Sequence, residues 1–360
     1  MIECQIKIEL DSFILDANFS IPDKGVTVIF GPSGSGKTSL LRVLAGLEKT
    51  HKGFLKIGDS IWQDSENFVL THKRQIGYVF QDTTLFEHLN VQGNLDYGIT
   101  RSSNIEKEFI DSILNLLDIK TLLNRSIAQL SGGEKQRIAI ARALLVKPKI
   151  LLMDEPLSAL DNKRKQEILP YLDALHNDLD IPIIYVTHSP DEASRLADYL
   201  LLLDHGKVIG SGPINTMLTR FDLPMSHGSE ATSLVEAKVI SREKEFNLMH
   251  LDFPGGEFLV PDNHLPIGSI VRLRVSARDV SLTKEKQIDT SILNIFPAIV
   301  EEMSPEGKAQ IMVRLKINET TLLTLITKKS AKILASIVLP LVRDLSFSYG
   351  FSIPYLLITV

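Results

Sequence analysis

Glycine, lysine and threonine residues near the N-terminus have the spacing of a phosphate-binding loop. The segment from Gly31 to Thr38 reads GPSGSGKT, and its glycines let backbone N–H groups surround phosphate oxygens. In such a loop Lys37 reaches the β- and γ-phosphates and the Thr38 hydroxyl binds Mg²⁺. An apolar run precedes the loop and a helical pattern follows it. This order predicts a nucleotide site formed by Gly31, Pro32, Ser33, Gly34, Ser35, Gly36, Lys37, Thr38 and Ser39.

A second glycine-rich segment stands before another helical pattern. Ser131 and Glu134 have the spacing of a capping box, in which each side chain accepts a hydrogen bond from the other residue's backbone N–H. Capping does not require Gly132 and Gly133, which lower helix propensity by roughly 1 kcal/mol each. We therefore expect this helix start to meet a phosphate, with two copies of the chain facing each other. Capping alone is the alternative reading.

Two adjacent acids, Asp154 and Glu155, end the apolar run 150–153. Adjacent side chains at a strand end point in different directions, so the two carboxylates can take different roles. We expect Asp154 to hold Mg²⁺, directly or through water. We expect Glu155 to orient or deprotonate the water that attacks the γ-phosphate. The alternative is a pair of solvated acids.

Two more polar residues follow strand-like runs. His188 comes after the run 183–186, and Gln81 comes after 78–80. In open α/β sheets, ligands bind at the carboxyl ends of the strands. We therefore expect His188 to sense the γ-phosphate and Gln81 to contact Mg²⁺ or the attacking water. A surface or loop-packing histidine is the alternative for His188.

The elements that must position these residues fall into two regions. Strand-like runs alternate with helical patterns from Met1 to about Gly212, which predicts a mostly parallel sheet covered by helices. Apolar residues recur every four positions inside the segment 85–130, which predicts a helical insertion. After a predicted linker at 226–233, apolar and polar residues alternate, which predicts β-strands in small barrels. We expect an α/β domain at 1–225 and a β-barrel domain at 234–360.

The composition restricts the possible partners. The net charge is −5 and the isoelectric point is about 6.0, which gives no reason to expect nucleic acid. The single cysteine, Cys4, cannot form an internal disulfide and is expected to be a small buried residue. No apolar run approaches the roughly 18 residues of a transmembrane helix. A role at a membrane would therefore need spanning subunits from other chains.

Taken together, the motifs resemble the nucleotide-binding subunits of ABC transporters. The resemblance covers residues 1 to about 220. In chain order, the matching segments are Gly31–Thr38 (Walker A), Gln81 (Q-loop), Leu130–Glu134 (signature), Ile150–Glu155 (Walker B), Ser158–Asp161 (D-loop) and His188 (switch histidine).

The resemblance implies a P-loop NTPase fold that hydrolyses ATP with Mg²⁺. It implies a head-to-tail dimer, in which the signature residues Ser131, Gly132, Gly133 and Glu134 of one copy close the phosphate loop of the other. It also implies that Phe13 stacks on adenine and that Asp161 reports across the interface.

Finer features indicate one branch of the family. Residues 77–98 and 169–172 are similar to the ATP-binding subunits of bacterial molybdate importers, and residues 275–282 and 291–294 resemble the TOBE/Mop-like barrels that follow the ATPase there. This implies membrane-spanning permease subunits as partners, contacted by the helical insertion. It also implies an extracytoplasmic oxyanion-binding protein as an indirect partner, and a peripheral position at the cytoplasmic face of the bacterial inner membrane. Ser291 and Asn294 become candidate oxyanion ligands, although Leu293 stands where relatives often have a basic residue.

Other readings stay open. One is an ABC importer for another solute, such as sulfate or a sugar. Another is an ABC-type ATPase that acts in DNA repair or on ribosomes, against which the lack of a long coiled-coil insertion, a second cassette or a basic stripe argues. An oxyanion storage module would leave the ATPase motifs unexplained. From about Ser336 the resemblance ends, and we hypothesise an altered or frame-shifted C-terminus, which re-reading the coding DNA in all frames would test.

Overall fold

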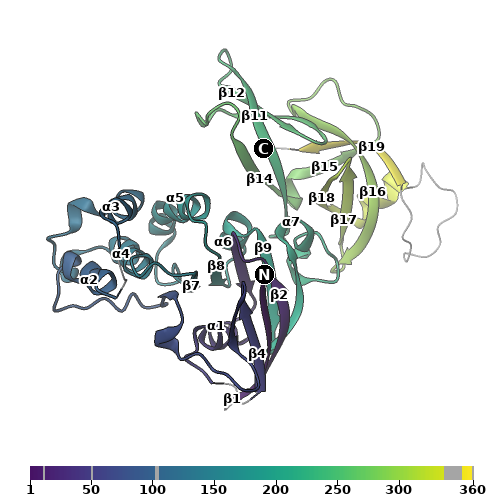
Figure 1. Ribbon diagram of the computed structural model, residues 1–360. Coiled ribbons are helices and arrows are strands. Elements are labelled where there is room, and N and C mark those ends of the chain that lie inside the picture. Colours follow the sequence, from purple (N-terminus) through teal and green to yellow (C-terminus); the bar gives the residue numbers. More distant parts are fainter. Residues whose placement is uncertain (11–12, 50–51, 102–104, 336–350, 359–360) are drawn as a thin grey trace. The chain divides into compact units, whose positions relative to one another are not determined.

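The computed structural model describes residues 1–10, 13–49, 52–101, 105–335 and 351–358. Its internal contacts divide the chain into two units, Met1–Gly212 and Pro213–Val360, and Figure 1 labels many of their helices and strands. The segment 226–233, predicted as a linker, holds the end of a short helix, Pro224–Ser226, and the start of a strand at Thr232. The boundary at 225 stays a prediction.

The first unit is built on one ten-stranded sheet in the order β5-β4-β1-β2-β10-β9-β3-β8-β7-β6. Strands β6, β7, β8, β3 and β9 pair in parallel, whereas β1, β2, β4 and β5 form antiparallel pairs. The strands are β1 (Ile2–Leu10), β2 (Phe13–Ile21), β3 (Val26–Phe30), β4 (Lys52–Ile57), β5 (Ser60–Gln63), β6 (Ile76–Val79), β7 (Ile150–Asp154), β8 (Ile183–Thr187), β9 (Tyr199–Asp204) and β10 (Lys207–Pro213).

Burial explains why the sequence of each strand differs. Strands β7 and β8 are buried along their whole length and read as continuous apolar runs, as expected for central parallel strands. Strand β2 has one exposed face and alternates between exposed and buried residues. Along the chain, the buried residues of these central strands are therefore followed directly by the polar residues of the motifs.

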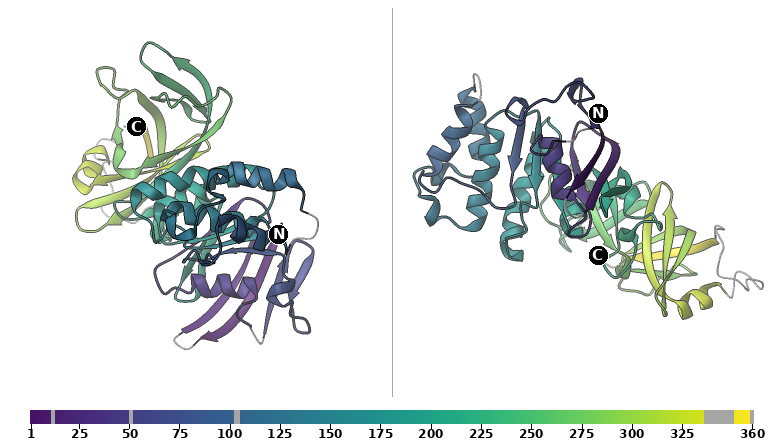
Figure 2. Two further views of the ribbon diagram at one scale, coloured as in Figure 1. Left: turned by 90° about the vertical axis from the view of Figure 1, so that its left-hand side faces the viewer. Right: turned by 90° about the horizontal axis from the view of Figure 1, so that it is seen from below.

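Four helices of the first unit pack together around α4. Helices α2 and α3 each pack against α4, and α3 and α4 also contact α5. Figure 2 shows α2, α3 and α4 on the opposite side of this unit from β1, β2 and β4. The helices are α1 (Lys37–Ala45), α2 (Val91–Ile99), α3 (Lys107–Leu116), α4 (Gly132–Leu144), α5 (Asn162–Asp178) and α6 (Pro190–Leu196), with short 3₁₀ helices at Thr71–Lys73, Lys120–Leu122 and Ile127–Gln129.

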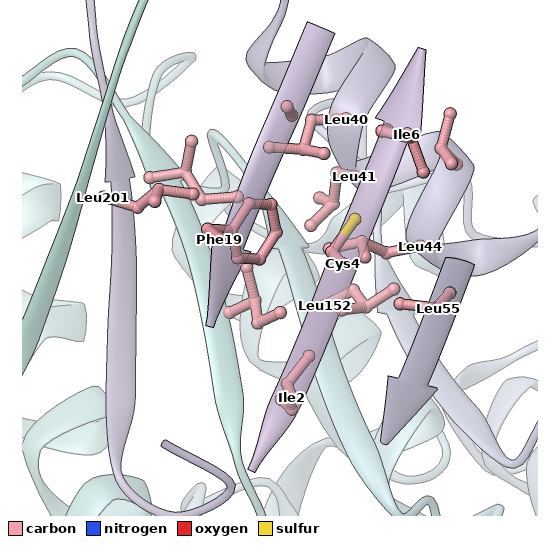
Figure 3. Close-up of a cluster of buried hydrophobic side chains, with 14 of the residues drawn as sticks. Ile2, Cys4, Ile6, Phe19, Leu40, Leu41, Leu44, Leu55, Leu152 and Leu201 are labelled. Carbon is pink, nitrogen blue, oxygen red and sulfur yellow. The ribbon is translucent and has the colours of Figure 1, made fainter. Parts of the chain in front are cut away.

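A hydrophobic core fixes α1 against the sheet, and Figure 3 shows part of it. Leu40, Leu41 and Leu44 on α1 are fully buried among apolar side chains of β1, β2, β4 and the central strands. Cys4 lies in this cluster, as expected for a small buried residue, and burial raises the pKa of its thiol to about 12. Arg74 donates to the carbonyls of Val43 and Leu44 and so caps the end of α1. The helix that starts at the phosphate loop is therefore packed against the sheet and capped at its C-terminal end.

The second unit is mostly β. A four-stranded antiparallel sheet has the order β13-β12-β11-β14, and a five-stranded sheet has the order β15-β19-β16-β17-β18. Phe253, Phe258 and Phe296 pack together in its core, with ring centroids 4.6 to 5.1 Å apart. The elements are α7 (Ile214–Met217), η4 (Pro224–Ser226), β11 (Thr232–Glu243), β12 (Leu248–Phe253), β13 (Gly256–Pro261), β14 (Ile270–Ser276), η5 (Ala277–Asp279), β15 (Val280–Thr283), β16 (Asn294–Glu306), β17 (Gln310–Ile317), β18 (Thr320–Thr327), α8 (Lys328–Ala335) and β19 (Phe351–Ile358).

The predicted fold class, an α/β P-loop domain with a helical insertion followed by an all-β region, is confirmed. The residues from Ser304 to Gly307 are of types that favour turns, but β16 continues to Glu306 and Pro305 pairs with Ile311. Gly307, with a φ of 58°, starts the turn, because this backbone conformation favours glycine.

Two expectations concern the C-terminus and the membrane. The segment 336–350, part of the suspected altered C-terminus, lies outside the described residues. Strand β19 follows it and pairs with β15 and β16. Within the described ranges, we find no helix that is both long enough and apolar enough to cross a bilayer.

Candidate nucleotide site

The phosphate loop connects β3 to α1 and depends on glycine at several positions. Gly34 and Gly36 have φ angles of 79° and 99°, in the left-handed region that favours glycine. A Cβ atom on Gly31 would lie 2.0 Å from the carbonyl oxygen of Leu203, so a larger residue cannot fit there. A Cβ on Gly36 would lie 2.9 Å from the ring of Phe13. Phe13, predicted to stack on adenine, therefore lies directly beside the loop.

Lys37 is buried at the centre of the loop. Its Nζ donates to the carbonyls of Gly31 and Pro32, both at 2.9 Å. Burial lowers the pKa of Lys37, and the negative charges of Glu155 and Asp154 offset part of this effect. The ammonium group has two neutral acceptors and lies 3.8 Å from Glu155 Oε1. A phosphate would supply a stronger counter-charge at the same place.

Asp154 ends β7 as a buried carboxylate. Its Oδ1 accepts a hydrogen bond from Thr38 Oγ1 at 2.9 Å, and its Oδ2 accepts one from the Tyr78 hydroxyl at 3.3 Å. Burial raises the pKa of Asp154 although both hydrogen bonds act in the opposite direction. Burial also raises the pKa of Tyr78, so the phenol stays protonated as a donor. A cation at this position would relieve the cost of burying the carboxylate.

Glu155 leaves the strand in a strained conformation. Its φ is 43°, which is uncommon for a residue with a side chain. Its backbone is fixed because its N–H donates to the carbonyl of Val186 at 3.0 Å and its carbonyl accepts from the Ser158 hydroxyl at 2.8 Å. Its Oε2 lies 3.0 Å from Nδ1 of His188. Residues held in such conformations often belong to functional sites.

The sheet order brings these side chains together. Strands β3, β8 and β7 are adjacent and parallel, so their carboxyl ends meet at one edge. Contacts join Lys37 to Glu155, Thr38 to Asp154, and Glu155 to His188. Gln81 lies two residues beyond β6, the neighbour of β7, and is exposed. Ser33 and Gly34 are exposed in the loop, whereas Ser35 is buried.

The capping box at the start of α4 is present. Ser131 N–H donates to Glu134 Oε2 at 2.8 Å, and Glu134 N–H donates to Ser131 Oγ at 3.3 Å. The bond from the Ser131 backbone lowers the pKa of Glu134. Gly132 also has a packing reason that the sequence did not reveal, because a Cβ there would lie 2.9 Å from Cδ2 of Leu160. Phosphate approach is therefore not the only explanation for the first glycine.

Asp161 lies at the start of α5. Its Oδ1 accepts from the backbone N–H of Arg164 at 2.9 Å, and its carboxylate lies 3.5 Å from the Arg164 side chain. Asp161 is exposed. It therefore acts as a helix cap while its carboxylate still faces solvent.

The two candidate oxyanion residues differ. Asn294 is 5% exposed, and its side-chain amide accepts from the N–H of Leu259 at 2.8 Å and donates to the carbonyl of Leu259 at 3.0 Å. It thus joins β16 to β13 as a backbone pair would. Ser291 is exposed. An oxyanion role for Ser291 and Asn294 stays a prediction, and the structure gives Asn294 a structural role in addition.

Sequence reasoning missed Tyr78. Its hydroxyl reaches Asp154 because β6 and β7 are neighbours and Tyr78 pairs with Leu152 in register. The sequence offered one indication, because Tyr78 carries a hydroxyl group within an otherwise apolar run just before Gln81. That signal became useful only once the order of the strands was known.

A phosphate loop between a strand and a helix, with paired acids at the end of a neighbouring parallel strand, defines the P-loop nucleoside triphosphatase class. A family model described as ABC transporter matches residues 14–158. The molybdenum import ATP-binding protein ModC of Methylococcus capsulatus is 48% identical over 334 residues, which cover 92% of this chain and 94% of the relative. The protein of the same description from Thiobacillus denitrificans is 46% identical, with 92% of each chain covered. The chain belongs to the ABC transporter family of ATP-binding proteins, and the resemblance inferred from sequence is confirmed.

Solved structures agree with this assignment. The cbiO1 protein of Clostridium perfringens, part of an ABC transporter complex, aligns with a TM-score of 0.54 at 27% identity over 61% of this chain and 90% of its own. The dimeric structure of a bacterial ABC transporter cassette aligns with a TM-score of 0.50 at 28% identity over 59% of this chain and 99% of its own.

Proposed function

We propose that this chain is the ATP-hydrolysing subunit of a molybdate importer. The main support comes from relatives described as molybdenum import ATP-binding proteins, which are 46 to 48% identical over 92% of this chain. The match therefore extends beyond the first unit into the second. The nucleotide site by itself is common to ABC ATPases and does not identify a solute.

ATP binding uses the loop between β3 and α1. The backbone N–H groups of the loop and the N-terminus of α1 provide partial positive charge for the phosphates. Lys37 exchanges its two carbonyl acceptors for phosphate oxygens, which give the buried ammonium charged acceptors at hydrogen-bond distance in place of neutral ones. Phe13 stacks on the adenine beside the loop.

The residues present fit a magnesium ion. Thr38 Oγ1 and Asp154 Oδ1 are 2.9 Å apart, and hydroxyl and carboxylate oxygens are the ligands that Mg²⁺ prefers. Thr38, Asp154 and Gln81 would hold the ion, which when bound neutralises phosphate charge. Thr38 and Asp154 then give up the hydrogen bond between them.

Hydrolysis depends on Glu155 and His188. Glu155 orients the attacking water and accepts its proton, and the 3.0 Å contact with His188 Nδ1 fixes the direction of the carboxylate. His188 lies between this carboxylate and solvent with 52% of its side chain exposed, so it can also meet the γ-phosphate. Lys37 Nζ lies 3.8 Å from the other oxygen of this carboxylate, Glu155 Oε1.

The complete site needs a second copy of the chain. The Ser131 hydroxyl accepts from Glu134 N–H through a lone pair, so its proton is free to donate to a γ-phosphate held by the other copy. Capping and phosphate contact are therefore compatible. Asp161 faces the partner across the same interface.

Transport requires further partners, and we include them in the proposal. The insertion that carries α2 and α3 contacts membrane-spanning permease subunits, which places this chain peripherally at the cytoplasmic face of the bacterial inner membrane. An extracytoplasmic oxyanion-binding protein delivers the solute. Nucleic acid has no role.

The test is ATP hydrolysis by the complex of this chain with its permease in lipid vesicles. Binding protein loaded with molybdate should raise the hydrolysis rate above the rate with empty binding protein. Vanadate should inhibit both rates. Stimulation by a sulfate-loaded or sugar-loaded protein, with none by molybdate, would contradict the assignment of the solute while leaving the ATPase assignment intact.

A further inference from the structure

A buried carboxylate next to the nucleotide site has no part in the mechanism above. Glu192, on α6, is 4% exposed. Its Oε2 accepts hydrogen bonds from the Tyr185 hydroxyl at 2.9 Å and from Thr187 Oγ1 at 2.8 Å, and its Oε1 accepts one from Lys165 Nζ at 3.0 Å. A buried carboxylate is expensive unless it is paired, and this one has three donors. Its donors join this carboxylate to β8 and to α5.

On one side, Glu192 fixes the loop that carries His188. The Thr187 hydroxyl, which donates to Glu192, accepts from the backbone N–H of Ser189 at 3.0 Å. The Ser189 hydroxyl in turn accepts from the backbone N–H of Glu192 at 3.4 Å. The residues on both sides of His188 are therefore bonded to Glu192 or to its partner Thr187. This arrangement supports the 3.0 Å contact between His188 and Glu155.

On the other side, Glu192 contacts α5, the helix that follows Asp161, which is the residue predicted at the dimer interface. Lys165 lies in the first turns of α5, and its backbone N–H donates to the carbonyl of Asp161 at 2.9 Å. The side chain of Lys165 is 23% exposed and that of Glu192 is 5% exposed, so water screens the pair only partly. One ion pair thus joins the segment with Asp161 to the loop with His188.

The third donor, the Tyr185 hydroxyl, holds the Glu192 carboxylate in place. Burial raises the pKa of Tyr185 well above its ordinary value, and the negative charge of Glu192 raises it further. The phenol therefore stays a donor to Glu192. Tyr185 belongs to β8 and pairs with Met153 in β7, directly before Asp154. The carboxylate is anchored to the same strands that carry the site.

We propose that Glu192 is a positioning residue for ATP hydrolysis, which holds His188 against Glu155 and links that loop through Lys165 to the helix that begins after Asp161. The inference rests on the proposed roles of Glu155 and His188. Glu192 touches neither nucleotide nor water in this account and acts only through its neighbours. A change at the Asp161 segment is then transmitted to His188 through the Lys165–Glu192 ion pair.

The first test is Glu192→Gln in the full-length chain. The amide oxygen can still accept from Tyr185 and Thr187, but the amide N–H₂ faces Lys165, so the ion pair is lost. We expect kcat to fall about 10- to 100-fold, the range for a misplaced catalytic group, while the KM for ATP changes by less than about twofold. Glu167→Gln is the matched control, because Glu167 is an exposed carboxylate on α5. Its kcat should equal that of the unchanged protein.

The second test is a double-mutant cycle with His188→Ala. If Glu192 acts through His188, adding Glu192→Gln to His188→Ala should lower kcat no further. Independent, multiplicative losses would overturn the proposal, and so would an unchanged kcat in Glu192→Gln. Lys165→Met tests the same link without changing the buried carboxylate, and it should also lower kcat without raising KM. It serves in place of Glu192→Gln should that variant fail to fold.

The same assay separates this inference from the proposed function. Hydrolysis that persists in Glu155→Gln would remove the basis of the proposed mechanism. If Glu155→Gln abolishes hydrolysis but the effects of Glu192→Gln and His188→Ala on kcat multiply, only the role of Glu192 is overturned.

Discussion

At the scale of single residues, two adjacent carboxylates have opposite environments. Asp154 is 5% exposed and accepts from two hydroxyl groups, whereas Glu155 leaves the strand and contacts a basic side chain on each side. The difference arises from the backbone, because Glu155 turns away at a φ of 43°. One acid can therefore hold a cation while the other handles a proton.

Asp154→Asn should make the chain more stable and less active. An acid whose pKa is raised by folding destabilises the folded state whenever it is ionised, so at neutral pH the amide removes that penalty. The amide can still accept from Thr38 and can donate to the Tyr78 oxygen. We expect the free energy of unfolding to rise by about 1 kcal/mol and the gain in ATP affinity on adding Mg²⁺ to disappear. Thermal unfolding and ATP titrations with and without Mg²⁺ measure both effects, and a lower melting temperature would contradict the argument.

Among the elements, the start of α4 combines a helix cap with the phosphate contact that we propose for it. The reciprocal bonds between Ser131 and Glu134 satisfy the first N–H groups of the helix. The same end of the helix carries the partial positive charge that favours phosphate. The packing of Gly132 against Leu160 brings the segment 158–161 close to this helix start.

Ser131→Ala separates the two functions. Loss of the cap should lower the free energy of unfolding by only about 1 kcal/mol, because the Glu134 side chain still accepts from the backbone at position 131. ATP hydrolysis should be largely lost, because the hydroxyl that we propose as a donor to the γ-phosphate of the other copy is gone. Melting temperature and steady-state hydrolysis are measured on the same preparation. A large drop in melting temperature with normal hydrolysis would instead favour capping as the only role.

The sequence predicted best those features that depend on neighbouring residues in the chain. The phosphate loop, the paired acids and the two glycines of α4 are local patterns, and so is the alternation that predicted the all-β region. Tyr78 and Glu192 were missed because their partners lie on other strands and helices, and hydrophobic periodicity does not give the order of strands in a sheet. Asn294 became a candidate oxyanion ligand through a resemblance alone, and its structural role was missed because its partner Leu259 lies 35 residues away in the chain.

At the scale of the whole molecule, each unit has its own core and its own stabilising polar contacts. In the second unit, His227 lies before the first strand and joins the hairpin of β16 and β17. Its Nδ1 is 2.9 Å from Glu306 Oε2, and its Nε2 is 2.8 Å from the carbonyl oxygen of Phe221. Both partners are acceptors, so both ring nitrogens donate only when the imidazole is protonated.

The second unit should therefore lose stability as pH rises. Burial lowers the pKa of His227, but the bonds to Phe221 and Glu306 outweigh it and raise the pKa above its ordinary 6.5. The contribution is complete below the unfolded pKa and disappears as pH rises through the folded pKa. Calorimetry of the full chain between about pH 6 and pH 9 should show a falling unfolding temperature for this unit. His227→Gln should flatten that dependence, and an equal slope in both proteins would contradict the assignment.

We propose that Glu155 activates the water for ATP hydrolysis in a site completed by a second copy of the chain. The most direct measurement is steady-state hydrolysis and size-exclusion chromatography of Glu155→Gln with ATP, beside Glu167→Gln as the control. We predict that Glu155→Gln binds ATP with unchanged affinity, hydrolyses it at least about 100-fold more slowly, and elutes as a dimer when ATP is present. Hydrolysis at the rate of the control, or a variant that stays monomeric with bound ATP, would contradict the account.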